Sequence, residues 1–144
     1  MKHRLQEILL IDDSHSDNFI HERRIRNMGV TERIVTKYNG REAIDYLNTA
    51  LSEDTYPAPD LIFLDINMPV MDGWEFLDAY AELPDEKKAR IVLAMLTTST
   101  ATQDKERAEK SHQLSKFITK PLTERDLRVI LSEHFPELGL SEEE

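Results

Sequence analysis

The feature that most constrains the fold is a run of four apolar residues that ends on an acid. Leu61–Leu64 follows the breaker cluster 57–60, Pro-Ala-Pro-Asp, and stops at Asp65. A short, uninterrupted apolar run of this kind predicts a strand buried on both faces, as in the interior of a parallel sheet. Residues 66–73 include Asn, Pro and Gly and would form the loop into the next helix. Ligands of open α/β sheets bind at the carboxyl ends of the strands, so Asp65 is the first candidate for chemistry.

Four further strands are predicted, and three of them end on polar groups. Ile8–Ile11 is a second buried run, and it stops at the acids Asp12 and Asp13. A β-branched, amphipathic strand, expected at the sheet edge, is predicted over Arg33–Tyr38. Another strand, Ile91–Leu96, is followed by hydroxyl side chains that begin with Thr97. The last strand, Lys116–Thr119, is followed by the amine of Lys120 and by Pro121.

Helical spacing of apolar residues predicts a helix after each strand. In the first helix, Ser14–Met28, Gly29 stands where a glycine would end it, and four apolar residues lie at near-helical spacing: Phe19, Ile20, Ile25 and Met28. The segment 102–111 has few apolar anchors, so that helix should be loosely docked. A second helix, Arg41–Leu51, should follow an Asn39-Gly40 turn and face the sheet with Ala43, Ile44 and Leu47. A third should begin at Trp74 and end before Pro84. The last, Thr123–Phe135, should have Asp126 in its cap and face the sheet with Leu127, Ile130 and Leu131.

Strand and helix alternate through five units, which predicts an α/β fold. We expect a doubly wound, flavodoxin-like sheet of five parallel strands in the order 2-1-3-4-5, with helices on both faces. One domain should cover residues 1–135, followed by an acidic, disordered tail over 136–144 and by no effector domain.

Composition narrows the range of partners. Lys and Arg number 18 against 28 Asp and Glu, which gives a net charge of −10 and disfavours nucleic acid or an anionic membrane as a direct partner. There is no cysteine, hence no disulfide, thiolate zinc site or cysteine nucleophile. Residues 1–7 lead into only four apolar residues, so we expect no signal peptide or membrane span and place the protein in the cytoplasm.

The polar groups at the strand ends should meet, because parallel strands end at the same edge of a sheet. Three clustered carboxylates either acquire raised pKa values or bind a hard divalent cation, and Mg²⁺ prefers such oxygen ligands, with the backbone carbonyl of Asn67 as a further candidate. Asp65 is then best placed as a nucleophile toward a phosphoryl group, whose oxygens an amine and a hydroxyl can contact. The converging residues are Asp12, Asp13, Asp65, Thr97 and Lys120.

Each of these residues also has a structural interpretation. The acids Asp12 and Asp13 could cap the following helix, Lys120 could be a surface lysine, and Thr97 could be an ordinary strand end. Taken together, the two acids, the hydroxyl and the amine favour a functional site, because chance would otherwise have to place all four groups at the same edge of one sheet. Trp74 and the five histidines are interpreted as core or surface residues, and His15, which lies near the acids, is assigned no role.

From about Glu7 to His134 the sequence resembles the receiver domain of two-component response regulators, of the CheY-like, stand-alone single-domain type. The resemblance lies in four motifs: Ile11-Asp12-Asp13, the segment from Leu64 to Gly73 (LDINMPVMDG), Leu96-Thr97-Thr98-Ser99, and Phe117-Ile118-Thr119-Lys120-Pro121. The sequence departs from the family in lacking glycine near 113–114 and in its long connection 52–59. That connection resembles those of stand-alone receivers that partner phytochrome-type sensor kinases.

The resemblance implies a phosphorelay function. Asp65 would accept a phosphoryl group from a histidine kinase or phosphotransfer protein, and Mg²⁺ would be held by Asp12, Asp13, Asp65 and the Asn67 carbonyl. Lys120 would contact the phosphoryl group, and its bond to Pro121 would be cis. Thr97 and Phe117 would move on phosphorylation and remodel the face of the fourth helix, fifth strand and fifth helix, while kinases would dock near 16–28.

We therefore expect a phosphorylation-controlled signalling protein that catalyses its own modification and is not a conventional enzyme. Three rivals remain. A Mg²⁺-dependent phosphohydrolase would favour an acid two residues after the nucleophile, where Asn67 stands, and a flavodoxin-like nucleotide binder would need a phosphate-cradling loop where residues 12–17 are acidic. The third is an adaptor that works unphosphorylated. The downstream protein target and the formation of a homodimer stay open.

Overall fold

The computed structural model describes residues 4–49, 57, 59–84, 92–97, 106–107, 110 and 116–139. Its core is a parallel sheet of five strands in the order β2-β1-β3-β4-β5, which confirms the predicted topology. The amphipathic strand is at the edge, as expected. The first strand begins three residues earlier than predicted, the last strand has the predicted bounds, and the other boundaries differ by at most two residues. The strands are β1 (Leu5–Ile11), β2 (Thr31–Lys37), β3 (Leu61–Asp65), β4 (Val92–Thr97) and β5 (Lys116–Thr119).

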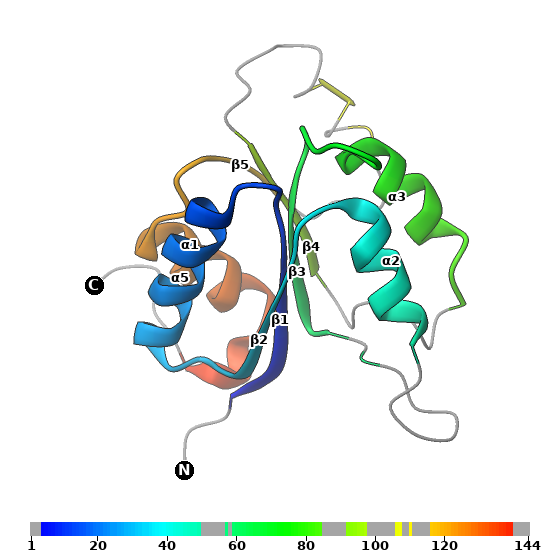
Figure 1. The fold of residues 1–144 in the computed structure, drawn as a ribbon. Coiled ribbons are helices and arrows are strands. Elements are labelled where there is room, and N and C mark those ends of the chain that lie inside the picture. Colours follow the sequence, from blue (N-terminus) through cyan, green and yellow to red (C-terminus); the bar gives the residue numbers. More distant parts are fainter. Residues whose placement is uncertain are drawn as a thin grey trace.

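Helices cover both faces of this sheet, with α1 and α5 on one side and α2 and α3 on the other (Figure 1). Side chains alternate between the faces: Ile8 and Leu10 of β1 pack in the core beneath α1 and α5, whereas Leu9 and Ile11 pack beneath α2 and α3. Both faces of the central strands are covered by apolar side chains, which explains why these strands are unbroken apolar runs in the sequence. The helices are α1 (His15–Met28), α2 (Gly40–Asn48), α3 (Gly73–Ala81) and α5 (Glu124–His134).

Polar side chains fix where the helices begin. Ser14 caps α1 and Asn39 caps α2 by accepting hydrogen bonds from backbone N–H groups three residues on. The Asn39-Gly40 pair, predicted as a turn, is thus the start of the helix. The predicted cap of α5 is confirmed, with a reciprocal pair of hydrogen bonds between Thr123 and Asp126.

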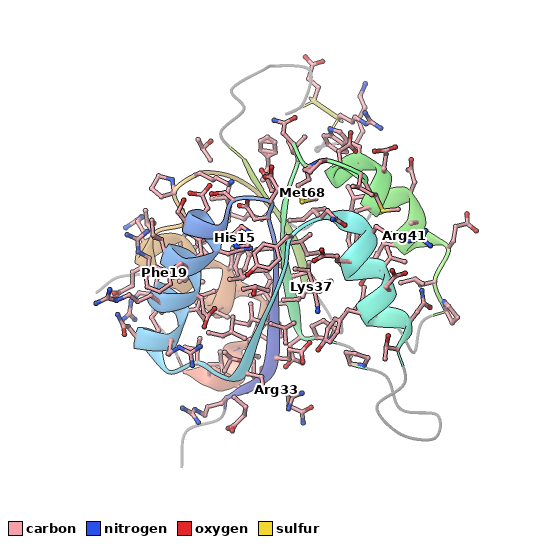
Figure 2. The ribbon with its side chains drawn as sticks, viewed as in Figure 1. His15, Phe19, Arg33, Lys37, Arg41 and Met68 are labelled. Atoms are coloured by element: carbon pink, nitrogen blue, oxygen red, sulfur yellow. The ribbon has the colours of Figure 1, made fainter. Side chains whose placement is uncertain are left out.

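The predicted apolar face of α1 is wrong in part. Phe19 and Ile20 are 63% and 45% exposed, and Phe19 lies on the side of α1 that faces away from the sheet (Figure 2). The buried face consists of Asn18, His21 and Ile25 instead. Two of these residues are polar, and each has a backbone partner: Asn18 Nδ2 donates to the Asp12 carbonyl, and His21 Nε2 accepts from the Leu122 N–H. Gly29 ends the helix at a φ of 65°, as predicted.

The chain remains ordered beyond α5. Pro136–Leu138 forms a short 3₁₀ helix closed by Gly139, and Leu138 packs against the core beneath α5. The prediction of disorder is therefore wrong for 136–139, because an apolar side chain anchors this turn. Residues 140–144, most of the 52–59 connection and most of the 102–111 segment lie outside the described residues, although 106, 107 and 110 are helical. No helix in the described ranges has the length and apolar composition needed to cross a bilayer.

Candidate functional site

The carboxyl ends of β1 and β3 bring three acids together. Asp12 and Asp13 follow β1, and Asp65 is the last residue of β3. Asp12 and Asp65 are buried, Asp13 is exposed, and one carboxylate oxygen from each lies within 4.8 Å of those of the other two. The convergence predicted for these acids is therefore confirmed.

Lys120 projects into the same cluster from the end of β5. Its ammonium Nζ lies 2.6 Å from Asp12 Oδ2, 2.9 Å from Asp17 Oδ2 and 3.5 Å from Asp65 Oδ1. The side chain is only 9% exposed, so the interpretation as a surface lysine is wrong. The bond between Lys120 and Pro121 is cis, as predicted.

Asp12 is held in place by its own backbone surroundings. Its Oδ1 accepts a hydrogen bond from the N–H of Ser14, and its carbonyl accepts one from the Nδ2 of Asn18. The cap of α1 is Ser14, so neither Asp12 nor Asp13 is needed to start the helix. The second oxygen of Asp12 is thereby left facing the cluster, where it meets Lys120.

The loop after β3 presses closely on Asp65. A Cβ on Gly73 would lie 2.5 Å from the Asp65 carbonyl oxygen and 2.8 Å from the Cα of Ile66, so only glycine allows this approach. The N–H of Gly73 donates to the Ile66 carbonyl at 2.7 Å. In the same loop, Asn67 is exposed, and Val70 has a φ of 68°, an unusual conformation for a β-branched residue.

The cluster perturbs the ionisation of its members. Burial raises the pKa of Asp65 to about 6; the charges of Asp12 and Asp13 add to the rise, and Lys120 opposes it. For Lys120, burial lowers the pKa, but its contacts with Asp12 and Asp17 and the charge of Asp65 outweigh burial, so the net pKa is raised. The lysine therefore stays protonated beside a carboxyl that is costly to ionise.

This donor set fits a hard divalent cation. Three carboxylates within reach of one another supply the oxygen ligands that Mg²⁺ or Mn²⁺ prefers. Burial and the charges of Asp12 and Asp13 disfavour the ionised form of Asp65, and a bound cation would offset this. Lys120 supplies one positive charge against the negative charges of Asp12, Asp13 and Asp65. The pocket therefore combines a cation site, a carboxylate at a strand end and a fixed ammonium.

Three polar residues of α1 near the cluster were missed or left without a role. Nothing in the sequence besides their helical spacing indicated a role for Asp17 or His21. In the structure, Asp17 contacts Lys120. His21 is buried and accepts a hydrogen bond from the Leu122 N–H. Burial lowers the pKa of His21, against the charges of nearby acids. The ring of His15 stacks on Tyr38, with centroids 4.1 Å apart.

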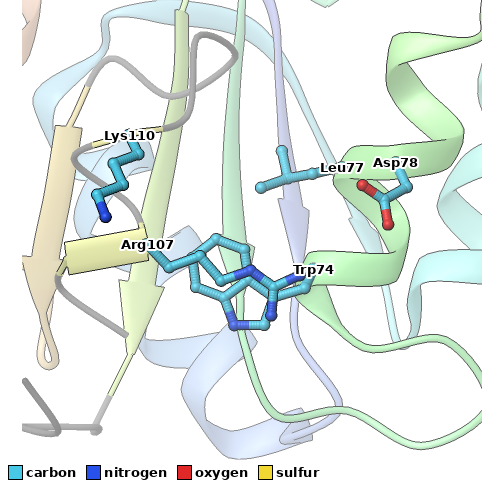
Figure 3. Close-up of a pocket in the computed structure, with 5 residues that line it drawn as sticks. All are labelled: Trp74, Leu77, Asp78, Arg107 and Lys110. Atoms are coloured by element: carbon cyan, nitrogen blue, oxygen red, sulfur yellow. The ribbon is translucent and has the colours of Figure 1, made fainter. Parts of the chain in front are cut away.

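A separate hollow of about 270 Å³ lies beside α3 (Figure 3). The guanidinium of Arg107 lies over the ring of Trp74, 4.4 Å from its centroid. None of the lining residues belongs to the acidic cluster, so this hollow is not part of the site; they are Trp74, Leu77, Asp78, Arg107 and Lys110.

Comparison with known families decides what the pocket belongs to. The sequence model of one protein family, the response regulator receiver domain, matches residues 8–132 of this chain. The chain belongs to this family. It is a receiver domain of two-component signalling, a signalling module rather than a true enzyme, and its pocket of Asp12, Asp13 and Asp65 is typical of a phospho-acceptor site. Receiver domains are phosphorylated by histidine kinases.

Individual relatives agree with the family match. Response regulator Rcp1 from Synechocystis sp. is 30% identical over 120 residues, which are 83% of this chain and 80% of Rcp1. A crystal structure of a two-component response regulator from Cytophaga hutchinsonii has a TM-score of 0.80 and 30% identity, covering 91% of this chain and 97% of that chain. The Mn²⁺-bound form of Rcp1 has a TM-score of 0.69 and 30% identity, covering 88% and 92%. The phosphorylated cyanobacterial phytochrome response regulator RcpA has a TM-score of 0.71 and 29% identity, covering 88% and 91%.

The other residues singled out in this receiver have definite places in the sheet. Thr97 is the last residue of β4 and is in register with Thr119 of β5; its side chain lies outside the described residues. Phe117 is half-buried on β5 and packs against the core beneath α2 and α3. Both therefore belong to the two strands on the side of β3 away from β1.

Proposed function

We propose that Asp65 is the phospho-acceptor of this receiver, that a histidine kinase or phosphotransfer protein is the donor, and that Mg²⁺ is the physiological cation. The protein then signals by contact with a downstream protein in the cytoplasm. The observation that carries the proposal is the position of Asp65: a buried carboxylate at the end of the central strand, 3.5 Å from the Lys120 ammonium and grouped with two further acids.

In the proposed reaction, a carboxylate oxygen of Asp65 attacks the phosphorus of a phosphohistidine. The P–N bond breaks, the imidazole leaves with the electron pair and takes up a proton, and an aspartyl phosphate forms. Asp65 must be ionised to attack, and its pKa of about 6 leaves most of it ionised at neutral pH. Lys120 stays protonated and offsets the charge that arrives with the phosphoryl oxygens.

Asp12, Asp13, Asp65 and the backbone carbonyl of Asn67 are the proposed cation ligands. When bound, Mg²⁺ would supply charge neutralisation for the phosphoryl oxygens. The three acids fit that role because their oxygens lie within 4.8 Å of one another. The Mn²⁺-bound Rcp1 structure, at 30% identity, supports a divalent cation in such a fold.

Thr97 and Phe117 are the proposed switch residues. In this proposal the Thr97 hydroxyl meets a phosphoryl oxygen, and Phe117 turns inward as it does so. Their positions support the pairing: β4 and β5 are neighbours, and Phe117 is in register with Met95, two residues before Thr97. The change would reach partners through the surface of β5 and α5, either on a target protein or on a second copy of the chain.

The acceptor is tested by incubating the protein with Mg²⁺ and acetyl phosphate and measuring its intact mass. We expect a gain of one phosphoryl group, about 80 Da, that needs both the cation and Asp65. Asp65→Asn and a chelated sample are the controls. A gain of the same size in Asp65→Asn would contradict the assignment.

A further inference from the structure

Three residues on one side of α1 form hydrogen bonds with Lys120 and with the backbone of Leu122. Asp17, His21 and Arg24 are four and three residues apart, so they share a side of the helix. Asp17 Oδ2 accepts a hydrogen bond from Lys120 Nζ at 2.9 Å. Two residues further along, the Leu122 N–H donates to His21 Nε2 at 3.2 Å, and the Leu122 carbonyl accepts from Arg24. The helix thus fixes both the lysine and the backbone behind it.

The Lys120 ammonium is in contact with three carboxylates at once. An ammonium has three N–H donors, and here three carboxylates surround it, from Asp12 at 2.6 Å, Asp17 at 2.9 Å and Asp65 at 3.5 Å. The two short contacts anchor the group, and the longest is the one to the acid that reacts. The Lys120 ammonium thus lies beside Asp65, where it can contact a phosphoryl group on that residue.

We propose that Asp17 is a positioning residue for the phosphoryl reaction. It holds the ammonium of Lys120 beside Asp65 before the donor arrives, without touching the phosphoryl group itself. A lysine side chain has a long flexible stem, so a second anchor besides Asp12 reduces the freedom it must lose in the transition state. The inference rests on the proposed function, because it concerns how fast Asp65 is phosphorylated.

A purely local role for Asp17 predicts different behaviour. An acid in the first turn of α1 also interacts favourably with the helix dipole, and this interaction affects stability, not the position of Lys120. The contact with Lys120 joins residues 103 apart in sequence. Its loss should therefore change a rate in protein that is still fully folded.

The test compares three full-length variants in a time course of intact mass with acetyl phosphate and Mg²⁺. Asp17→Ala removes the anchor, Asp17→Asn removes the charge but keeps an oxygen acceptor, and Glu22→Gln is the matched control. Glu22 lies on the same helix and pairs with Arg26, not with Lys120. We expect Asp17→Ala to be phosphorylated about 5-fold or more slowly, Asp17→Asn to stay within about 2-fold of wild type, and Glu22→Gln to be unchanged.

A second readout follows the lysine directly. A hydrogen-bonded ammonium exchanges its protons slowly, so a ¹H–¹⁵N signal of Lys120 Nζ should be present in wild type and Asp17→Asn. In Asp17→Ala the signal should be weaker, because only the contacts with Asp12 and Asp65 then remain. Far-UV circular dichroism checks that Asp17→Ala is folded, as expected for the best helix-forming residue in a first turn.

The outcomes separate the two proposals. Equal rates for wild type and folded Asp17→Ala would overturn the positioning role alone. Equal slowing in Asp17→Ala and Asp17→Asn would also overturn it, because charge and not a held position would then be responsible. Wild-type protein that gains no phosphoryl group, or gains it without Asp65, would overturn the proposed function and this inference together.

Discussion

We expect the ionised carboxylate of Asp65 to destabilise the folded protein when no cation is bound. Burial raises its pKa from an ordinary 3.8 to about 6, and the charge of Asp12 contributes. A shift of about two units corresponds to about 3 kcal/mol where the group is ionised in both the folded and unfolded states. We therefore predict that Asp65→Asn increases the free energy of unfolding by up to about 3 kcal/mol at neutral pH in the presence of a chelator.

The pH dependence of this effect has a fixed sign. At a pH below the unfolded-state pKa of 3.8, the carboxyl is protonated in both the folded and the unfolded state and does not change the free energy of unfolding. As the pH rises toward about 6, the unfolded chain releases its proton first, so the wild-type protein loses stability relative to Asp65→Asn. The advantage of the variant should be small near pH 4 and complete near pH 7.

Urea unfolding followed by far-UV circular dichroism, at a series of pH values with chelator, measures this difference. Asp78→Asn is the matched control, because Asp78 is an exposed acid on α3 outside the cluster, and its substitution should change stability little at any pH. The reasoning is refuted if Asp65→Asn is less stable than wild type at pH 7, or if its advantage is the same at pH 4.

Three further changes test the surroundings of the site. Val70→Asn should increase the free energy of unfolding by about 1 kcal/mol, because asparagine tolerates a positive φ better than a β-branched residue; urea unfolding with no gain over Val70→Ile would count against this strain. Gly73→Ala should lower stability by about 2 kcal/mol and slow phosphorylation, since the added Cβ would meet the carbonyl of Asp65; unchanged stability and rate would contradict that close approach. Burial lowers the pKa of His21 below its ordinary 6.5, so wild-type protein should lose stability relative to His21→Gln as the pH falls below 6.5. Parallel pH profiles of the two proteins would show that His21 is not held neutral.

The central site was predictable because it follows from topology. Once Leu61–Leu64 and Ile8–Ile11 are recognised as buried parallel strands, the residues after them must meet at one edge of the sheet. This reasoning placed Asp12, Asp65 and Lys120 correctly with no knowledge of distances. Only residues at the strand ends are located in this way.

The contributions of α1 could not be predicted by the same route. The rotation of a helix on a sheet depends on which side chains find partners, and here Asn18 and His21 are buried with backbone hydrogen bonds while Phe19 is exposed. Apolar spacing alone placed Ile25 correctly but also placed Phe19 and Ile20 on the buried face, where they are not. The contact of Asp17 with Lys120 joins residues 103 apart and requires the packed position of α1 to be known.

The position of the phosphoryl group tests the account most directly. Borohydride reduces an aspartyl phosphate to homoserine, and peptide mass mapping then locates the converted residue. After incubation with acetyl phosphate and Mg²⁺, the account predicts conversion at Asp65, and none at Asp12 or Asp13. Conversion at another residue, or a phosphoryl group that resists borohydride because it is held by histidine or serine, would contradict it.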